Sequence, residues 1–124
     1  MDKKTILIVD DNADTRLVLS ARLKAHHYHT VFAADALQAM SVALKERPDA
    51  ILLDLGLPGG NGLMVLQRLK ANTSLGSIPV IIVTAEDPLV AEARALETGA
   101  IAFLQKPVDQ DKLMAVVQQA VGTT

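Results

Sequence analysis

Apolar residues in this chain gather in four short runs, and each run is followed closely by a polar side chain that can take part in chemistry. Runs of about four apolar residues are typical of strands that are buried on both faces, as in a parallel sheet. Because parallel strands point the same way, their polar ends are expected to meet at one edge, where open α/β sheets bind ligands. The runs are residues 6–9 before Asp10 and Asp11, 50–53 before Asp54, 80–83 before Thr84, and 101–104 before Lys106, with one glutamine between.

Amphipathic segments alternate with these runs and predict five helices. A weaker strand is expected at residues 30–33, and the helices at residues 14–26, 35–45, 62–70, 88–99 and 109–121. Asp35 with Gln38 resembles a capping box, Asp87 with Pro88 opens the fourth helix, and Gly99 ends it. Residues 122–124 are expected to be a frayed end. Five strand-helix repeats predict one α/β domain over residues 1–124, a doubly wound parallel sheet with helices on both faces.

Composition narrows the classes of function. The chain has 124 residues, half of them hydrophobic, with two Phe, one Tyr and no Trp, so Ile, Leu, Val and Ala must build the core. A formal net charge of -2 gives no reason to expect nucleic acid or a membrane as a direct partner. Cysteine is absent, which excludes disulfides and thiol catalysis. No signal peptide or membrane span is apparent, so a cytoplasmic protein is expected.

The acidic residues predict a metal site. Asp10, Asp11 and Asp54 would repel one another at one sheet edge unless a cation lay between them. No Lys or Arg is adjacent to them in the sequence. A small number of hard oxygen ligands suits Mg²⁺, which often bridges carboxylates to phosphate. The pocket is therefore expected to support a Mg²⁺-assisted phosphoryl reaction.

Thr84 and Lys106 complete the expected site. A metaphosphate-like transition state spreads negative charge over three oxygens, which Mg²⁺, the Thr84 hydroxyl and the Lys106 ammonium can each stabilise. Asp54 lies on the middle run before a flexible loop, which makes it the expected nucleophile. Asp10 and Asp11 suit the metal better.

These residues lie in motifs that resemble the receiver (CheY-like) domain of bacterial two-component response regulators. Four motifs in order, over about the whole chain, carry the resemblance. They are Ile8-Val9-Asp10-Asp11-Asn12, Leu53-Asp54-Leu55-Gly56-Leu57-Pro58, Val83-Thr84-Ala85 and Lys106-Pro107. The resemblance implies a flavodoxin-like (βα)5 fold with strand order 2-1-3-4-5.

The resemblance also implies a role for each residue of the site. Asp54 would accept a phosphoryl group from a phosphohistidine, and Lys106 and Thr84 would assist. Asp11, Asp54 and the backbone carbonyl of Gly56 would bind Mg²⁺ directly, and Asp10 through a metal-bound water. The peptide bond before Pro107 is expected to be cis.

The same resemblance implies a conformational switch. After phosphorylation Thr84 would turn inward, and Phe103 would move into the vacated space and alter the surface of the fourth helix, last strand and last helix. The implied partners are a sensor histidine kinase or a histidine phosphotransfer protein, and a downstream effector domain or protein. Leu57 and Phe103 replace the more frequent Met and Tyr of the family. Asn12, Gly56 and Glu86 occupy positions that vary across the family, and they would tune the lifetime of the phosphoryl-aspartate.

Several other motifs resemble binding sites but have simpler structural interpretations. His26, His27 and His29 look like a metal cluster, but a solvated loop is the better interpretation. The segment 10–14 lacks the glycine and the glutamate of a calcium loop. The segment Gly59-Gly60-Asn61-Gly62 lacks the lysine of a phosphate cradle and indicates a flexible loop.

Three other functions compete with that of a phosphorylated receiver. A docking module of the same fold that acts without phosphorylation remains the alternative, although such modules can lose Asp10, Lys106 or the acceptor. A haloacid-dehalogenase phosphatase would need a second Asp two residues after Asp54, where Gly56 stands, so no enzyme activity beyond self-phosphorylation and autodephosphorylation is expected. A flavin protein would need hydroxyls after the first strand. The chain fits both a single-domain regulator and part of a longer protein.

Receivers of winged-helix transcription factors dimerise through a charged surface around the fourth helix. This chain has few charges in that region, which gives little support for such a dimer.

Overall fold

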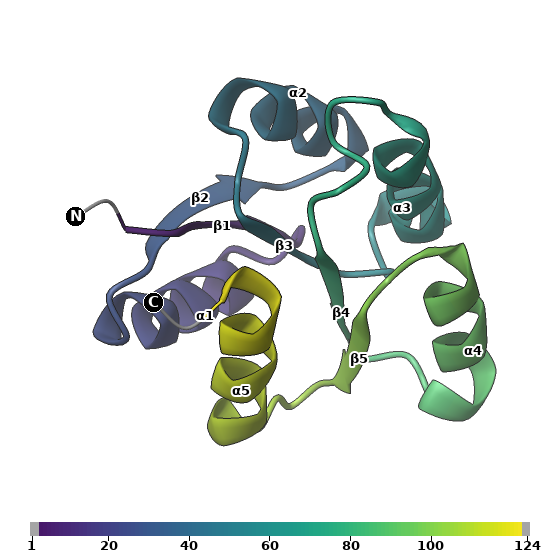
Figure 1. Cartoon of the computed structure of the whole chain (residues 1–124). Coiled ribbons are helices and arrows are strands. Elements are labelled where there is room, and N and C mark those ends of the chain that lie inside the picture. The colour runs from purple at the N-terminus through teal and green to yellow at the C-terminus, as the bar shows by residue number, and fades with distance from the viewer. Residues whose placement is uncertain (1–2, 123–124) are drawn as a thin grey trace.

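Strands and helices alternate along the whole of the computed structural model, which describes residues 3–122 (Figure 1). The strands are β1 (Thr5–Val9), β2 (His29–Ala33), β3 (Ala50–Leu53), β4 (Val80–Thr84) and β5 (Ala102–Gln105). The helices are α1 (Ala13–Ala25), α2 (Ala36–Glu46), α3 (Gly62–Ala71), α4 (Pro88–Thr98) and α5 (Gln110–Val121), with a short 3₁₀ turn, η1 (Pro58–Gly60), before α3.

The five strands form one parallel sheet in the order β2-β1-β3-β4-β5. This is the strand order and the flavodoxin-like fold that the sequence motifs implied. The strand order reverses between β1 and β3, because the chain first winds outward to β2 and then returns past β1. Ligands of doubly wound sheets bind at such a switch point, at the carboxyl ends of the strands.

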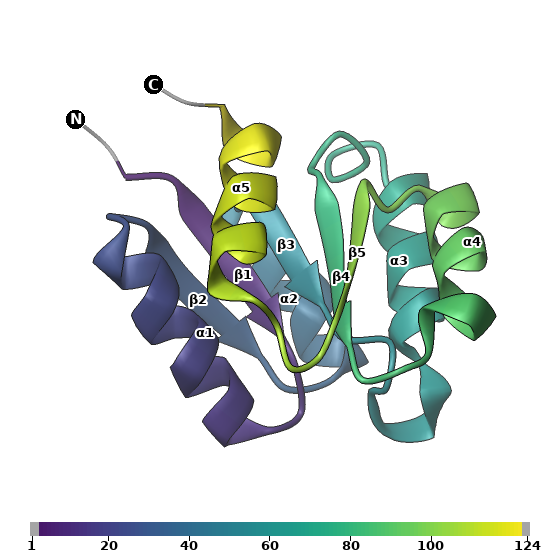
Figure 2. The same cartoon turned by 90° about the horizontal axis from the view of Figure 1, so that it is seen from below.

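Helices cover both faces of this sheet, as Figure 2 shows. On one face α1 and α5 bury Leu19, Leu23, Leu113 and Val117 against one side of the strands. On the opposite face α2, α3 and α4 pack against the other side. Strand side chains alternate between the two layers, so the aliphatic residues of β1, β3 and β4 supply both. Within residues 3–122 no Phe is fully buried.

Polar residues fix the helix starts as expected. The side chains of Asp35, Asp87 and Asp109 each accept a hydrogen bond from a backbone N–H in the first turn of α2, α4 and α5. Such caps stabilise a helix by about 1 kcal/mol each. Gln38 completes a variant of the capping box, since its side chain accepts from the N–H of Ala34 rather than from the cap residue itself. Gly99 ends α4 with a φ of 117°.

The last strand differs from the prediction. The run at 101–104 was expected to be buried on both faces, but Ile101 lies outside β5 and is 49 % exposed. The strand residues Ala102, Phe103 and Leu104 are only partly buried. The reason is that β5 is an edge strand with a neighbour on one side only. Helix boundaries differ from the expected ones by at most one residue. Of the expected frayed end, Thr123 and Thr124 lie outside the described residues.

Candidate phosphoryl-acceptor and metal site

The polar residues that follow the strands are held at one level by backbone hydrogen bonds that continue the sheet. The Asp10 N–H donates to the Ala33 carbonyl at 3.1 Å, and the Asp54 N–H to the Val9 carbonyl at 3.0 Å. Across the other half of the sheet, the Lys106 N–H donates to the Thr84 carbonyl at 2.8 Å. The loops after β1, β3, β4 and β5 consequently lie along one edge, at the bottom of the molecule in Figure 2.

The ammonium group of Lys106 lies between two of the aspartates. Its Nζ is 2.7 Å from Asp10 Oδ2 and 3.0 Å from Asp54 Oδ2. Asp10 is 1 % exposed and Asp54 7 %, so both carboxylates are shielded from water on most sides. Burial by itself would lower the pKa of Lys106, but its hydrogen bonds and its charge attraction to Asp10 and Asp54 outweigh burial and raise the pKa. A cation distant in sequence thus offsets the acids, which have no basic neighbour along the chain.

Three carboxylates converge at this edge. One oxygen each from Asp10, Asp11 and Asp54 lies within 4.8 Å of the others, and Asp11 is the exposed member. Hard oxygen donors at this spacing, with one side open to water, fit a Mg²⁺ ion that keeps several of its waters. The residues therefore fit the metal that the sequence motifs implied. Within residues 3–122 the acidic trio is the one such group, so the three histidines do not form a second.

Asp54 is also held by its own loop. The Gly56 N–H donates to Asp54 Oδ1 at 2.8 Å, while Lys106 takes the other oxygen. Gly56 therefore lies directly against the carboxylate through its N–H, whereas its carbonyl is the atom expected to bind the metal. The direct role of that carbonyl remains a prediction.

The residues expected to take part in the switch lie on β4 and on the edge strand β5. The Thr84 side chain is buried, and its Oγ1 accepts a long hydrogen bond of 3.3 Å from the Glu86 N–H. Phe103 pairs with Ile82 across the strands and packs, partly buried, against the α2–α3–α4 layer. The Lys106-Pro107 peptide bond is cis, as predicted.

Two further residues shape the site, although the sequence analysis gave them no role in it. Gly62 begins α3, and a Cβ at this position would lie 2.3 Å from the Leu55 Cα and 2.5 Å from the Asp54 carbonyl oxygen. Only glycine lets α3 approach the loop of the acceptor so closely. Arg16 in α1 donates from Nη1 to the Asp10 carbonyl at 2.6 Å. A glycine opening a helix was the visible signal for the first contact, whereas no local pattern marks the second.

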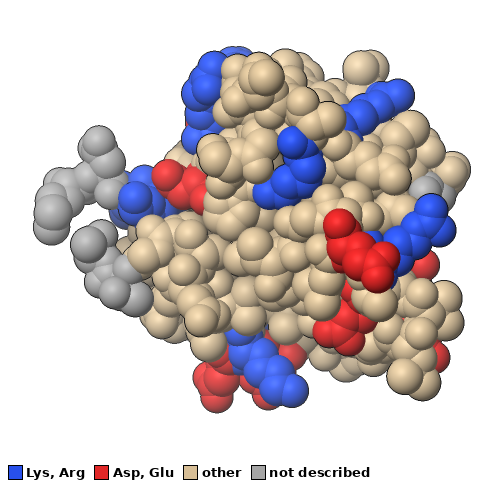
Figure 3. Space-filling model, turned by 45° about the vertical axis from the view of Figure 1, so that its right-hand side comes forward, with Lys and Arg blue, Asp and Glu red and all other residues tan. Residues whose placement is uncertain are grey.

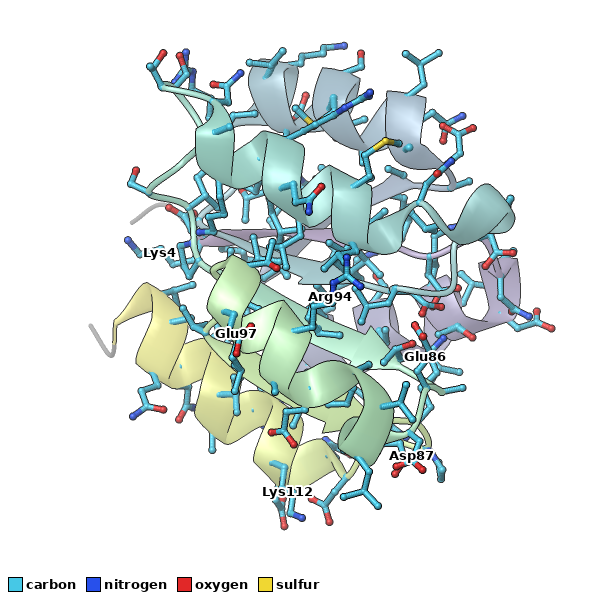
Figure 4. The ribbon with its side chains drawn as sticks, turned by 90° about the vertical axis from the view of Figure 1, so that its right-hand side faces the viewer. Lys4, Glu86, Asp87, Arg94, Glu97 and Lys112 are labelled. Carbon is cyan, nitrogen blue, oxygen red and sulfur yellow. The ribbon has the colours of Figure 1, made fainter. Side chains whose placement is uncertain are left out.

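A hollow of about 330 Å³ lies beside Gly56, between α3 and α4. Leu55, Leu63, Val90 and Ala91 give it apolar walls, and Glu86 and Arg94 give it charge. Figure 4 shows Glu86 and Asp87 near the start of α4, and Arg94 further along the helix. The surface over this side of the molecule is mostly uncharged, with separate acidic and basic groups (Figure 3).

A doubly wound sheet with an acid trio and a lysine at its carboxyl edge is an α/β domain whose switch-point site could hold a metal ion. The family model of the response regulator receiver domain matches residues 6–118. The chain therefore belongs to the response regulator receiver family, in which signalling by phosphorylation is typical.

Individual relatives agree with this assignment. The chain is 41% identical over 114 residues to the response regulator PleD of Caulobacter vibrioides, covering 91% of this chain and 25% of that protein. It therefore spans about a quarter of PleD. It is 38% identical over 119 residues to sporulation initiation phosphotransferase F of Bacillus subtilis, covering 96% of this chain and 94% of that protein.

A solved structure also resembles this one closely. It is the receiver domain of sensor histidine kinase PA1611 from Pseudomonas aeruginosa PAO1, with a magnesium ion coordinated in its active site cleft. The TM-score is 0.88 at 30% identity, and the match covers 98% of this chain and 100% of the other. Among the helices of residues 3–122, none has the length and apolar character needed to cross a membrane.

Proposed function

We propose that this chain accepts a phosphoryl group on Asp54 from a phosphohistidine of a sensor kinase or a phosphotransfer protein, with Mg²⁺ at Asp10, Asp11 and Asp54. The observation that carries the proposal is the buried Asp54 carboxylate, which shares one ammonium with Asp10 inside the acidic trio. We expect a cytoplasmic location, where such a phosphohistidine donor would be available. Activity is limited to self-phosphorylation and autodephosphorylation.

Transfer requires one new bond and one broken bond. An Asp54 oxygen attacks phosphorus in line, the P–N bond to the donor imidazole breaks, and its electron pair returns to that nitrogen. A bound Mg²⁺ would supply positive charge for the phosphoryl oxygens. Lys106 already lies 3.0 Å from Asp54 Oδ2, so its ammonium needs little movement to bind a phosphoryl oxygen attached there.

The same step would bias the switch. A phosphoryl group adds acceptor oxygens beside Thr84, whose hydroxyl has a single hydrogen bond, a long one, among residues 3–122. Turning of Thr84 would free space toward β5 for Phe103. Phe103 borders a hollow of about 280 Å³ with Gln105, Pro107 and Lys112 of β5, its loop and α5. It also packs against the cluster that contains Ala91 and Ala95 of α4, so a change in its position would reach the surface of α4, β5 and α5. That surface is the proposed contact for an effector.

Labelling with a small phosphodonor tests the acceptor. Acetyl phosphate or phosphoramidate with Mg²⁺ should phosphorylate the protein at one site, read by intact mass. Asp54→Asn should abolish the label. Asp35→Asn is the matched control, because Asp35 follows β2 at the same edge and asparagine caps a helix equally well. Mg²⁺-dependent labelling that persists in Asp54→Asn would overturn the assignment.

The same variant tests the docking alternative. Binding of an effector should depend on phosphorylation in the natural sequence and lose that dependence in Asp54→Asn. Equal effector affinity with and without phosphodonor, in both proteins, would favour a docking module that needs no phosphorylation.

A further inference from the structure

Arg16 contacts the site through the backbone rather than through a carboxylate. It lies in the first turn of α1, and its Nη1 donates to the Asp10 carbonyl oxygen at 2.6 Å. That carbonyl belongs to the peptide unit that joins Asp10 to Asp11. The guanidinium group therefore holds the peptide plane from which both acidic side chains project.

The two acids differ in how many other contacts hold them. The Asp10 carboxylate accepts from the Asn12 N–H at 2.9 Å and from Lys106 at 2.7 Å. The Asp11 side chain is exposed, and within residues 3–122 no hydrogen bond or ion pair to it is present. The position of Asp11 relative to Asp10 and Asp54 therefore depends on the peptide unit that Arg16 holds.

The positive charge of Arg16 would lower the affinity for Mg²⁺, whereas its hydrogen bond to the Asp10 carbonyl would raise it. In the described part of the chain both ion pairs to carboxylates are those of Lys106, so Arg16 neutralises none of the acids by direct contact. A guanidinium group so close to a metal site repels Mg²⁺. Removing Arg16 would thus tighten Mg²⁺ binding if only its charge mattered, and weaken binding if its hydrogen bond positions the ligands.

We infer that Arg16 is a positioning residue of the divalent-cation site, and that it holds the Asp10-Asp11 peptide so that Asp11 faces Asp10 and Asp54. The inference rests on the proposed Mg²⁺ site. Groups that orient metal ligands are commonly worth about 10–100-fold in metal affinity. Asp11 is exposed and its side chain has no hydrogen bond or ion pair within residues 3–122, so it is the ligand most dependent on such support.

The test is a Mg²⁺ titration by isothermal calorimetry on the whole chain. Arg16→Met, which keeps an apolar stem and removes donor and charge, should raise the Mg²⁺ Kd about tenfold. Arg16→Lys, which keeps the charge but not the forked donor, should give a smaller increase. At saturating Mg²⁺ the rate of labelling by acetyl phosphate should return to near that of the natural sequence in both variants.

Arg22→Met is the matched control. Arg22 is also a half-buried arginine of α1 whose Nη1 donates to a backbone carbonyl, that of Val108 at 3.0 Å. Its removal should leave the Mg²⁺ Kd within about twofold, since its bond lies outside the metal loop. Urea unfolding without Mg²⁺ verifies that each variant is folded, and Arg16→Lys serves if Arg16→Met is not.

The outcomes separate this inference from the proposed function. If the natural sequence binds Mg²⁺ and the Arg16 variants bind it equally well or more tightly, the positioning role is overturned and the metal site stands. Equal weakening in Arg22→Met would also overturn it, because loss of α1 packing would then explain the result. Absence of Mg²⁺ binding in the natural sequence would contradict both.

Discussion

A half-buried lysine lies at each end of the parallel strands: Lys106 at the carboxyl edge of the sheet and Lys70 at the amino edge. The two lysines have opposite surroundings. At the carboxyl edge Lys106 bonds the carboxylates of Asp10 and Asp54, and its pKa is raised. At the amino edge Lys70 bonds the neutral carbonyls of Gly76 at 3.2 Å and Ile78 at 2.8 Å. Burial lowers the pKa of Lys70, because carbonyl dipoles do not replace the lost water.

The difference shows that the same type of side chain has a structural role at one edge and a charge-dependent role at the other. Lys70 closes the loop between α3 and β4, and the charge of its ammonium is a cost of that position. Lys106 is held by its charge, so any change in the negative charge around Asp54 changes its balance of contacts. Each edge also has a glycine in close contact: Gly62 meets the acceptor loop, and Gly99 lies against the stem of Lys70.

Replacing each lysine by methionine should give the largest contrast. Lys106→Met should lose the phosphorylation-dependent change at the α4–β5–α5 surface, because no ammonium remains to bind the phosphoryl oxygens. Lys70→Met should keep that change in full. Amide resonances of α4 and β5, recorded with and without phosphodonor, measure both. An unchanged response in Lys106→Met would remove the functional distinction between the edges.

Mg²⁺ should stabilise the folded protein only by binding to the acidic residues at the carboxyl edge. At a Mg²⁺ concentration of 100 times its Kd, the free energy of unfolding should rise by about 2.7 kcal/mol. Lys70→Met should show the same increase, and Asp54→Asn a much smaller one, because a ligand oxygen has lost its charge. Urea unfolding with and without Mg²⁺ gives the values. An equal increase in Asp54→Asn would move the metal away from this edge.

The two glycines should differ in what alanine does. Gly62→Ala forces the backbone of α3 and the Asp54-Leu55 loop apart, and should cost about 1–3 kcal/mol and slow labelling of Asp54. Gly99→Ala should cost about 1 kcal/mol, because its φ of 117° disfavours a side chain. Labelling in Gly99→Ala should be unchanged.

The loss of stability in Gly99→Ala can be separated into a steric contribution and a backbone contribution. A Cβ there would lie 2.9 Å from Lys70 Cγ, the stem of a flexible side chain. Adding Lys70→Ala should therefore recover the part of the loss that comes from the clash and leave the part that comes from the backbone. A double-mutant cycle by urea unfolding measures the coupling, and additive effects would show that the clash contributes nothing.

The pH dependence of stability should have opposite signs at the two lysines, and this is the smallest expected effect. The raised pKa of Lys106 means that its contribution is complete below about 10.4, the unfolded value, and is lost as pH rises through the folded value. The lowered pKa of Lys70 means that its cost is present at neutral pH and relieved as pH approaches about 10.4.

Urea unfolding between neutral and alkaline pH measures both signs. As pH rises, the natural sequence should lose its advantage over Lys106→Met and gain relative to Lys70→Met. Parallel shifts for the two pairs would contradict the assignment of the two environments.

Local pattern was enough for most of the fold. The aliphatic runs, the cap residues Asp35, Asp87 and Asp109, and Gly99 mark their elements because strand burial and helix capping depend on near neighbours. The pattern failed at Ile101, where exposure depends on β5 lying at the edge of the sheet. An apolar run has the same appearance in a central strand and in an edge strand.

The sequence by itself determined that Asp10, Asp11, Asp54, Thr84 and Lys106 follow strands that point the same way, and so share one edge. Only the tertiary structure decided which atoms meet: Lys106 with two carboxylates 96 and 52 residues away, Arg16 with the peptide between two acids, and Gly62 with the acceptor loop. The physical reason is that strand direction is encoded by short-range hydrophobic pattern. Contacts between side chains at an edge depend instead on strand order, register and helix placement, which the whole chain sets together.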